Sequence, residues 1–408
     1  MIRKSTIRGK VSAPPSKNYA IRLVFSSLFT DIALDNLMMS DDVEDALNAV
    51  SIFGVRFDGR RFIRPEKIAL HSDRIYLKGS ATVLRMLIPI AAVVGGRIYI
   101  DGGESLRRRP IKAVVEALSG RGVVFSNNSL PTVMEGRLRD TYIEISGHES
   151  SQYISGFMIA FAMVGGGTIK IIPPLASRRY VELTAEVLTV LGVDVKIYEN
   201  RIDVNVAERP RGYTGSVPGD YLLASFYVSS ALLTGGEIVV DNLANLSGDA
   251  KPHRVVDAYR EMGGYSLYSN GVWHARASDN YAGIRINVFD DPDLAVSIAS
   301  LAAVARGETV IEGIENLRIK ESDRVETIIS TLRALGIYAY TKGNSIHIVG
   351  GEPREASISC PDDHRIAMMF ASIALRVGGS IDKAECVNKS NPGFWRDLIL
   401  LGGDIHVS

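Results

Sequence analysis

The chain has 408 residues, of which 46% are hydrophobic, so it is long enough to build two packed cores rather than one. Lys and Arg together number 46, as do Asp and Glu, and this zero net charge argues against a nucleic-acid-binding protein. The charged N-terminal residues are unlike a signal peptide, and no apolar run approaches the roughly 20 residues of a membrane span, so we expect a cytoplasmic protein with no membrane partner.

One pattern recurs six times along the chain, in which glycine or an equivalent residue separates an apolar helix-like stretch from an alternating strand. Glycine in this position is typical of a left-handed helix end. A polar loop and a second amphipathic helix follow each strand, and two β segments complete every repeat except the last. The six strands begin at Thr30, Gly95, Gly165, Gly235, Arg306 and Gly378.

The spacing of these strands divides the chain into six repeats of about 68 residues. Each repeat has the order strand, helix, strand, helix, strand, strand, which is neither a doubly wound sheet nor a solenoid of short repeats. Glycine pairs also punctuate unrelated α/β proteins. The ends of both helices nevertheless recur at equivalent positions in all six units, which favours a true repeat.

The first helix of each repeat begins with polar or charged residues. A helix N-terminus presents free N–H groups and a positive dipole end, so it attracts anions. The residues at these six starts are, in chain order, Lys17 and Arg22; Ser80, Thr82 and Arg85; Ser150, Ser151 and Gln152; Asp220; Asp293; and Asp363, His364 and Arg365.

Several of the second helices also begin with cations, which cost stability at a helix N-terminus unless an anion compensates them. Any single one of these residues can instead be an ordinary cap or a solvated surface group. Together they predict a site for a small polyanionic ligand. They are Arg107, Arg108 and Arg109; Ser177, Arg178 and Tyr180; Asn316, Lys320, Glu321 and Arg324; and Lys389.

The remaining residue types predict neither a metal nor an organic cofactor. The two cysteines, Cys360 and Cys386, are too few for a disulfide framework and fit a reducing compartment, so we interpret both as small buried apolar residues, Cys386 on a strand. The seven histidines show no metal-ligand spacing. The glycine run at 165–167 leads into a strand, whereas a phosphate loop leads into a helix.

Six tracts together resemble the 5-enolpyruvylshikimate-3-phosphate synthase family, over almost the whole chain. The most specific is NLRIKESDR at 316–324, which is similar to the family's Asn-x-Arg-x-Lys-Glu-x-Asp-Arg signature. The other five occur in the family's order and are Lys17 to Arg22, Arg107 to Pro110, Ser150 to Gln152, Asp363 to Arg365, and Cys386 to Lys389.

This resemblance implies an α/β fold with two similar domains, each made of three βαβαββ repeats in the inside-out α/β barrel of the enolpyruvyl transferases. One domain would be discontinuous, 1–14 plus 219–408, and would carry the general base and the phosphoenolpyruvate-binding cations. The other, 15–218, would bind shikimate-3-phosphate. Hinges would lie near 13–16 and 216–219, with the two substrates in the cleft between the domains.

The implied activity is transfer of the enolpyruvyl group of phosphoenolpyruvate to the 5-hydroxyl of shikimate-3-phosphate, in chorismate and aromatic amino acid biosynthesis. The hydroxyl would add to C2 while C3 gains a proton, and the tetrahedral ketal would then lose phosphate. Asp293 would act as the general base and Glu321 as the acid, with Lys17 and His364 sharing the proton transfers. Cations would stabilise the leaving phosphate.

The resemblance also implies two binding sets, and no partner beyond the small-molecule substrates, so we expect a monomer. The set for shikimate-3-phosphate is Lys17, Asn18, Arg22, Ser150, Ser151, Gln152, Ser177, Asp293, Asn316 and Lys320. The set for phosphoenolpyruvate is Lys17, Ala81, Arg109, Gln152, Arg324, Arg365 and Lys389.

Three positions depart from the family pattern. Asn18 stands where serine is usual, Arg179 replaces a common proline, and Gly79, Ser80 and Ala81 replace Asn-x-Gly. A methyl group at Ala81 would crowd the phosphoenolpyruvate end of the site. We therefore predict weak inhibition by glyphosate, the family's phosphoenolpyruvate-site inhibitor.

Two alternatives remain, a sister enzyme and a protein of a non-catalytic class. The first is the sister enzyme that transfers enolpyruvate to UDP-N-acetylglucosamine, which usually carries a cysteine in the loop that reads DGGESLRRRP here, at 101–110. The second is a non-catalytic binding scaffold built from repeats. The placement of Asp293 beside cationic turns argues against a plain scaffold, and the zero net charge argues against a DNA clamp.

Overall fold

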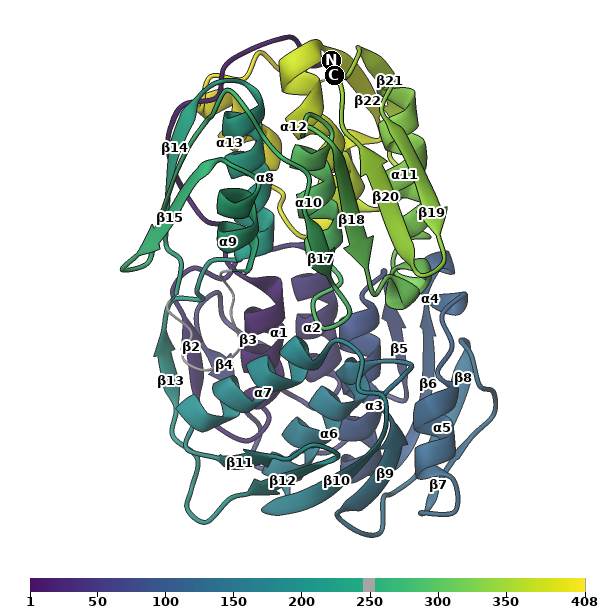
Figure 1. Ribbon diagram of the computed structural model, residues 1–408. Coiled ribbons are helices and arrows are strands. Elements are labelled where there is room, and N and C mark those ends of the chain that lie inside the picture. Colours follow the sequence, from purple (N-terminus) through teal and green to yellow (C-terminus); the bar gives the residue numbers. More distant parts are fainter. Residues whose placement is uncertain (245–253, 408) are drawn as a thin grey trace. The chain divides into compact units, whose positions relative to one another are not determined.

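The computed structural model describes residues 1–244 and 254–407, and its internal contacts divide the chain into two compact units (Figure 1). Unit 1 comprises Met1–Pro15 and Pro218–Ser408, and unit 2 comprises Ser16–Val217. These bounds differ by one residue from the predicted domain limits. Among the described residues, no helix has the length and apolar character needed to cross a membrane.

Unit 2 contains three copies of the repeat. Its helices are α1 (Lys17–Ser26), α2 (Asp41–Ser51), α3 (Ala81–Val94), α4 (Glu104–Arg107), α5 (Lys112–Leu118), α6 (Ser151–Met163) and α7 (Arg178–Val190). Its strands are β2 (Ile32–Leu34), β3 (Arg56–Phe57), β4 (Phe62–Ile63), β5 (Arg74–Leu77), β6 (Gly96–Gly102), β7 (Val123–Phe125), β8 (Thr132–Gly136), β9 (Tyr142–Ser146), β10 (Gly166–Ile172), β11 (Asp194–Ile197), β12 (Arg201–Asn205) and β13 (Tyr213–Gly215).

The sheets of unit 2 repeat one topology. In the orders β5-β6-β8-β7 and β9-β10-β12-β11, the first two strands are parallel and the remaining neighbours are antiparallel. The first copy is a reduced version, in which β13 pairs in parallel with β2 while β3 and β4 form an antiparallel pair. The repeat predicted from the sequence is therefore present in the strand pairing itself.

Unit 1 contains the other three copies. Its helices are α8 (Tyr221–Leu233), α9 (Arg254–Glu261), α10 (Leu294–Ala302), α11 (Arg324–Ala334), α12 (His364–Val377) and α13 (Phe394–Leu400), with the 3₁₀ helices η1 (Glu315–Ile319) and η2 (Ala384–Lys389). Its strands are β1 (Gly9–Ser12), β14 (Glu237–Asp241), β15 (Tyr265–Ser269), β16 (Val272–Arg276), β17 (Arg285–Asn287), β18 (Glu308–Glu312), β19 (Tyr338–Lys342), β20 (Ser345–Val349), β21 (Ala356–Ser359) and β22 (Gly379–Asp382).

The sheets of unit 1 follow the same rule. The orders β1-β14-β16-β15 and β17-β18-β20-β19 match those of unit 2, and the third sheet has only the parallel pair β21-β22. The strand that precedes α1 in the sequence, β1, pairs with β14, whereas the strand that precedes α8, β13, pairs with β2. The first and fourth repeats have thus exchanged their leading strands.

The first helix of each repeat supplies the core. The helices α3, α6, α8, α10 and α12 are buried around nearly their whole circumference, as expected for helices that are apolar on every side. Five of the six first helices begin at an N-cap whose side-chain oxygen accepts a backbone N–H, the caps being Ser16, Ser80, Ser150, Asp220 and Asp363. These capping residues therefore determine where the helices that carry the candidate site begin.

Both sequence-based expectations for the cysteines are wrong. Cys360 and Cys386 form a disulfide, and Cys386 lies in η2 rather than on a strand. The cause is tertiary: the parallel strands β21 and β22 end side by side, and each cysteine follows one of those ends. A spacing of 26 residues gives no hint of this pairing in the sequence.

Candidate active site

In unit 2 the predicted binding residues lie at the N-terminal ends of α1, α3, α6 and α7. Ala81 and Ser151 are the first residues of α3 and α6, and Ser177 precedes α7 in a left-handed conformation with φ of 55°. Arg109, which follows α4, is 8% exposed. These helix ends supply N–H groups and hydroxyls suited to phosphate and carboxylate oxygens.

Lys17, the first residue of α1, is a buried cation with a buried partner. Its Nζ donates to Asp42 Oδ2 of α2 at 2.5 Å, and the two side chains are 8% and 4% exposed. Asp42 was not predicted to have a role, because acidic residues in the first turn of a helix are ordinary. Removal of either member would leave the other as an isolated buried charge, which is strongly unfavourable.

Arg22 lies one turn further into α1 and is almost fully buried. Its guanidinium donates to Thr184 Oγ1 at 2.7 Å, to the Asn18 carbonyl at 2.7 Å and to the Tyr180 carbonyl at 2.8 Å. Burial lowers the pKa of Arg22 to about 10. These acceptors are uncharged, so none of them neutralises the positive charge of Arg22. The guanidinium group would therefore strongly attract an anion that bound close to it.

Arg85 of α3 extends this region and was not assigned to the site from the sequence. Its Nη1 donates to Gln152 Oε1 at 3.0 Å and to Ser150 Oγ at 3.3 Å, and its guanidinium lies 5.6 Å from the centre of the Tyr153 ring. Gln152 in turn donates to Thr82 Oγ1 at 2.7 Å. The predicted Ser150 and Gln152 are therefore oriented by a buried arginine from the neighbouring repeat.

Asp45 of α2 holds the segment that departs from the family pattern. Its carboxylate accepts the backbone N–H groups of Lys78, Gly79 and Ser80 at 2.7, 3.0 and 2.9 Å. Burial raises the pKa of Asp45, while the three backbone N–H groups act in the opposite direction. The turn that leads into Ala81 is thus held by a buried side chain that the sequence did not single out.

In unit 1 the predicted catalytic acids and arginines form one buried cluster. Arg324, the first residue of α11, contacts Asp293 Oδ1 at 2.5 Å, Asp363 Oδ2 at 2.7 Å and Glu321 Oε2 at 2.8 Å. Burial alone would lower the pKa of Arg324, but attraction by Asp363, Glu321 and Asp293 outweighs it and raises the pKa well above its ordinary value.

Asp293 differs from the other five helix starts. Its side chain does not cap α10, and its second oxygen instead lies 3.3 Å from Arg365 Nη2. Both carboxylate oxygens of Asp293 thus lie against arginine guanidinium groups. Asp363 was noted as a helix start but given no role, although its 0% exposed carboxylate both caps α12 and binds Arg324.

The other predicted residues of unit 1 lie on the elements around this cluster. His364 is the first residue of α12 and is 1% exposed. Asn316 is buried in η1, Lys320 directly follows η1, and Lys389 ends η2. The predicted set is thus brought together as two groups, one in each unit, and both groups stand at helix starts.

Comparison with known proteins identifies the family. Residues 2–398 match the family model described as EPSP synthase (3-phosphoshikimate 1-carboxyvinyltransferase). The chain belongs to the EPSP synthase family. The resemblance inferred from the six sequence tracts is therefore confirmed.

Curated members of the EPSP synthase family match this chain over almost its whole length. The 3-phosphoshikimate 1-carboxyvinyltransferase of Saccharolobus islandicus is 48% identical, covering 100% of this chain and 99% of the relative. The enzymes of the same name from Sulfurisphaera tokodaii and Caldivirga maquilingensis are 47% and 39% identical, and both comparisons cover at least 98% of each chain.

Solved structures confirm the fold class. An EPSP synthase from Acinetobacter baumannii has a TM-score of 0.80 at 24% identity, covering 98% of this chain and 97% of that chain. The enolpyruvyl transferase NikO from Streptomyces tendae has a TM-score of 0.75 at 16% identity, covering 99% and 97%. At such identities the likeness is one of fold alone, and it agrees with the predicted α/β enolpyruvyl transferase type.

Proposed function

We propose that this chain is a transferase that moves the enolpyruvyl group of phosphoenolpyruvate onto the 5-hydroxyl of shikimate-3-phosphate, in aromatic amino acid biosynthesis. The observation that carries the proposal is the match to the EPSP synthase family over residues 2–398, with end-to-end relatives named 3-phosphoshikimate 1-carboxyvinyltransferase. The roles proposed for individual residues rest on their positions in the two groups at the helix starts of units 1 and 2.

For unit 2 we propose contacts to both substrates. Ser150, Ser151 and Ser177 would donate hydrogen bonds to the phosphate of shikimate-3-phosphate. Arg22, whose own hydrogen-bond acceptors are uncharged, would attract the same phosphate. Lys17 and Arg109 would bind phosphoenolpyruvate. Because Lys17 is already paired with Asp42, the bound anion would add to an existing ion pair rather than meet an isolated ammonium group.

For unit 1 we propose the proton-transfer groups and the remaining cations. Arg324, Arg365 and Lys389 would hold phosphoenolpyruvate, and its anionic groups would compete with Asp293 for Arg324. That competition would free one Asp293 oxygen when the substrate arrives. A carboxylate relieved of one arginine is a stronger base, so binding would itself activate the residue.

The reaction would proceed by addition and elimination. Asp293 accepts the proton of the 5-hydroxyl, the oxygen forms a bond to C2, and Glu321 delivers a proton to C3, with Lys17 and His364 sharing these transfers. The ketal then loses phosphate from C2 as the methyl group returns a proton, which restores the enol double bond. The surrounding cations stabilise the negative charge on the departing phosphate.

Phosphate release tests the reaction and the assignments together. The wild-type chain should release phosphate from phosphoenolpyruvate only when shikimate-3-phosphate is added, and Asp293→Asn and Glu321→Gln should each lower kcat by about 10²–10⁴-fold. Asp290→Asn, at an exposed position just before α10, is the matched control and should retain wild-type rates. Release that requires UDP-N-acetylglucosamine instead would identify the sister enzyme, and full activity in either variant would remove the role given to that residue.

We also propose that the chain acts as a cytoplasmic monomer. Because disulfides are rare in strongly reducing compartments, the Cys360–Cys386 disulfide makes the redox state of the compartment the point to test. Alkylation of thiols in intact cells before lysis tests the compartment, because a disulfide that forms only after lysis would be trapped as two alkylated cysteines. Light scattering during gel filtration tests the assembly state, for which a monomer has a mass of 44.4 kDa.

A further inference from the structure

The disulfide joins two segments that lead directly into the candidate site. Cys360 stands three residues before Asp363, which binds Arg324 and caps α12. Cys386 stands three residues before Lys389, at the end of η2. The covalent link therefore connects the start of α12, with Arg365, to the short helix that carries Lys389.

This link lies at the end of the smallest sheet of unit 1. The other sheets of unit 1 have four strands each, whereas β21 and β22 form only a pair. Two-stranded pairs are marginally stable by themselves. Beyond the last paired residues, Ser359 and Asp382, the chain ends are held by one backbone hydrogen bond, from the Cys360 N–H to the Asp382 carbonyl at 3.0 Å, and by the disulfide.

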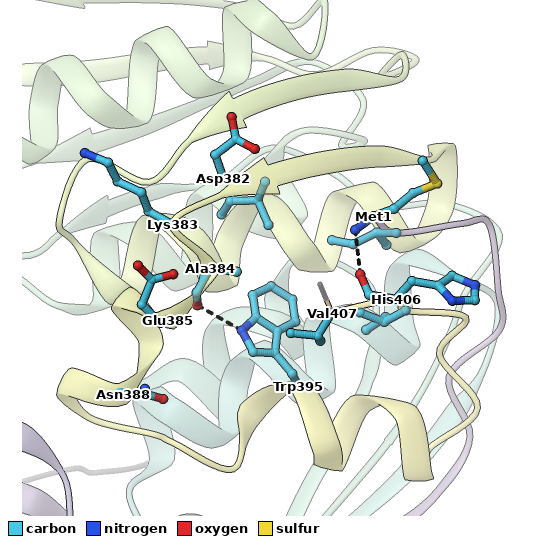
Figure 2. Close-up of a pocket in the computed structure, with 12 residues that line it drawn as sticks. Met1, Asp382, Lys383, Ala384, Glu385, Asn388, Trp395, His406 and Val407 are labelled. Carbon is cyan, nitrogen blue, oxygen red and sulfur yellow. Dashed lines mark hydrogen bonds between the residues drawn. The ribbon is translucent and has the colours of Figure 1, made fainter.

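Another side of η2 borders a pocket. A cavity of about 330 Å³ is lined by Ala384, Glu385 and Asn388 of η2 and by Trp395 of α13 (Figure 2). Across it, Trp395 Nε1 donates to the Ala384 carbonyl at 2.9 Å. On this side η2 borders a pocket, whereas Val387 of η2 is fully buried, so the disulfide acts together with that packing to fix the position of the short helix.

We propose that the Cys360–Cys386 disulfide is a positioning crosslink for the phosphoenolpyruvate-binding residues of unit 1, and that its reduction weakens phosphoenolpyruvate binding without stopping the reaction. This inference rests on the proposed function of Arg365 and Lys389. The reductant is a dithiol: it gives two electrons and two protons to the S–S bond, yields two cysteine thiols, and is itself oxidised to a disulfide. Both cysteines act through their neighbours and contact no substrate.

The effect should fall on one substrate. Loss of the crosslink adds the cost of ordering η2 to each binding event, so KM for phosphoenolpyruvate should rise about threefold to tenfold on reduction. KM for shikimate-3-phosphate and kcat should stay within about twofold, since the serines and Arg22 of unit 2 are not joined to the crosslink. A general loss of folded protein would instead lower kcat for both substrates alike.

The experiment compares untreated and dithiol-treated wild-type protein with Cys360→Ser, Cys386→Ser and the double variant. Alkylation under denaturing conditions should find no thiol in the untreated wild type and two after reduction. The cysteine variants should resemble the reduced wild type and should not respond to the dithiol. Ser380→Ala, which removes a hydrogen bond to Ser357 across the same strand pair, is the matched control and should keep the wild-type KM and its response to the dithiol.

Three outcomes overturn the inference: two reactive thiols in the untreated protein, an unchanged KM for phosphoenolpyruvate after verified reduction, or a dithiol response that persists in the double variant. Reduced wild type serves as the second measurement if a variant fails to fold. A wild-type protein that is oxidised yet releases no phosphate with both substrates would instead contradict the proposed function, so the two failures are distinguishable.

Discussion

Glu186 of α7 is a carboxyl whose titration should affect stability near neutral pH. Burial raises the pKa of this carboxyl from 4.5 to about 7. Between these values the unfolded chain has lost the proton while the folded chain keeps it, so the free energy of unfolding falls as pH rises through the window from 4.5 to 7. Allowing for screening at a half-buried group, the loss by pH 8 should be about 1–2 kcal/mol.

Glu186→Gln should remove this dependence. The variant should match the wild type at pH 4 and exceed its free energy of unfolding by about 1–2 kcal/mol at pH 8, measured by urea unfolding. Glu182→Gln, one turn earlier, is the control because Glu182 pairs with Arg178 and Arg179 near the surface. Loss of that pair should slightly lower stability at pH 8, and a Glu186 variant that behaved in the same way would contradict the burial argument.

Ala81 is the residue at which inhibitor specificity should be decided. Its side chain is a single methyl group at the start of α3, on a turn held by Asp45. Ala81→Gly should strengthen glyphosate inhibition by at least about tenfold, since one methyl group in a tight site is worth about 1–3 kcal/mol. Inhibition constants measured beside KM for phosphoenolpyruvate check this, and Ala81→Ser, which keeps a side chain, should remain weakly inhibited. Equal inhibition of wild type and the glycine variant would exclude the steric explanation.

At the scale of the element, some helix caps only accept backbone N–H groups, whereas others also form an ion pair with a buried side chain. Asp220 accepts the N–H groups of Leu222 and Leu223, both at 2.9 Å, at the start of α8. Asp363 caps α12 and also binds Arg324. Asp220→Ala should cost about 1–2 kcal/mol, and Asp363→Ala about 3–5 kcal/mol because the buried arginine loses a carboxylate.

Urea unfolding of the two alanine variants measures this difference. Both residues occupy the same place in the repeat, so each is the other's control. Equal losses would mean that the Arg324–Asp363 contact adds nothing beyond the cap. The asparagine variants, which retain a capping oxygen, should recover most of the loss at Asp220 and less of it at Asp363.

The elements that the sequence predicts best are those fixed by local signals. Ser80, Ser150 and Asp363 mark helix starts because a cap acts within three residues of itself. What escaped prediction depends on pairing between distant elements. Asp42 and Asp45 look like ordinary acids near the start of a helix, and only the packing of α2 against neighbouring elements buries them beside Lys17 and the 78–80 turn. The disulfide escaped for the same reason.

At the scale of the whole molecule, the repeats predict the number and order of strands but not every pairing. The order of the repeats in the sequence assigns β1 and β13 to the repeats that follow them, whereas β1 pairs with β14 and β13 pairs with β2. The resemblance to the family, rather than the repeat pattern, indicated that the N-terminal strand belongs with the C-terminal half. The assignment of each site residue to a substrate remains a prediction.

This pairing predicts different behaviour for the two halves of the chain. A fragment of residues 16–217 contains every strand partner of β2 through β13 and should unfold cooperatively by itself. A fragment of residues 218–408 lacks β1 and the buried Ile2 and Ile7, so it should fold poorly. Circular dichroism during heating checks both.

Addition of a peptide of residues 1–15 should restore a cooperative transition to the 218–408 fragment, and a scrambled peptide should not. If the 218–408 fragment unfolds cooperatively without the peptide, β1 is dispensable. If the 16–217 fragment fails to fold, its sheets depend on more than their own strands.

The exchange of leading strands has a consequence for chain order. The Met1 amino group donates to the His406 carbonyl at 2.8 Å, and Ile2 pairs with Ile405, so the two ends of the described chain meet within unit 1. A short linker there, with the chain opened between Val217 and Pro218, would give a circular permutant in which each unit is one uninterrupted segment. The chain would then pass from one unit to the other once instead of twice. The present chain order would then be one of two orders that give the same two units.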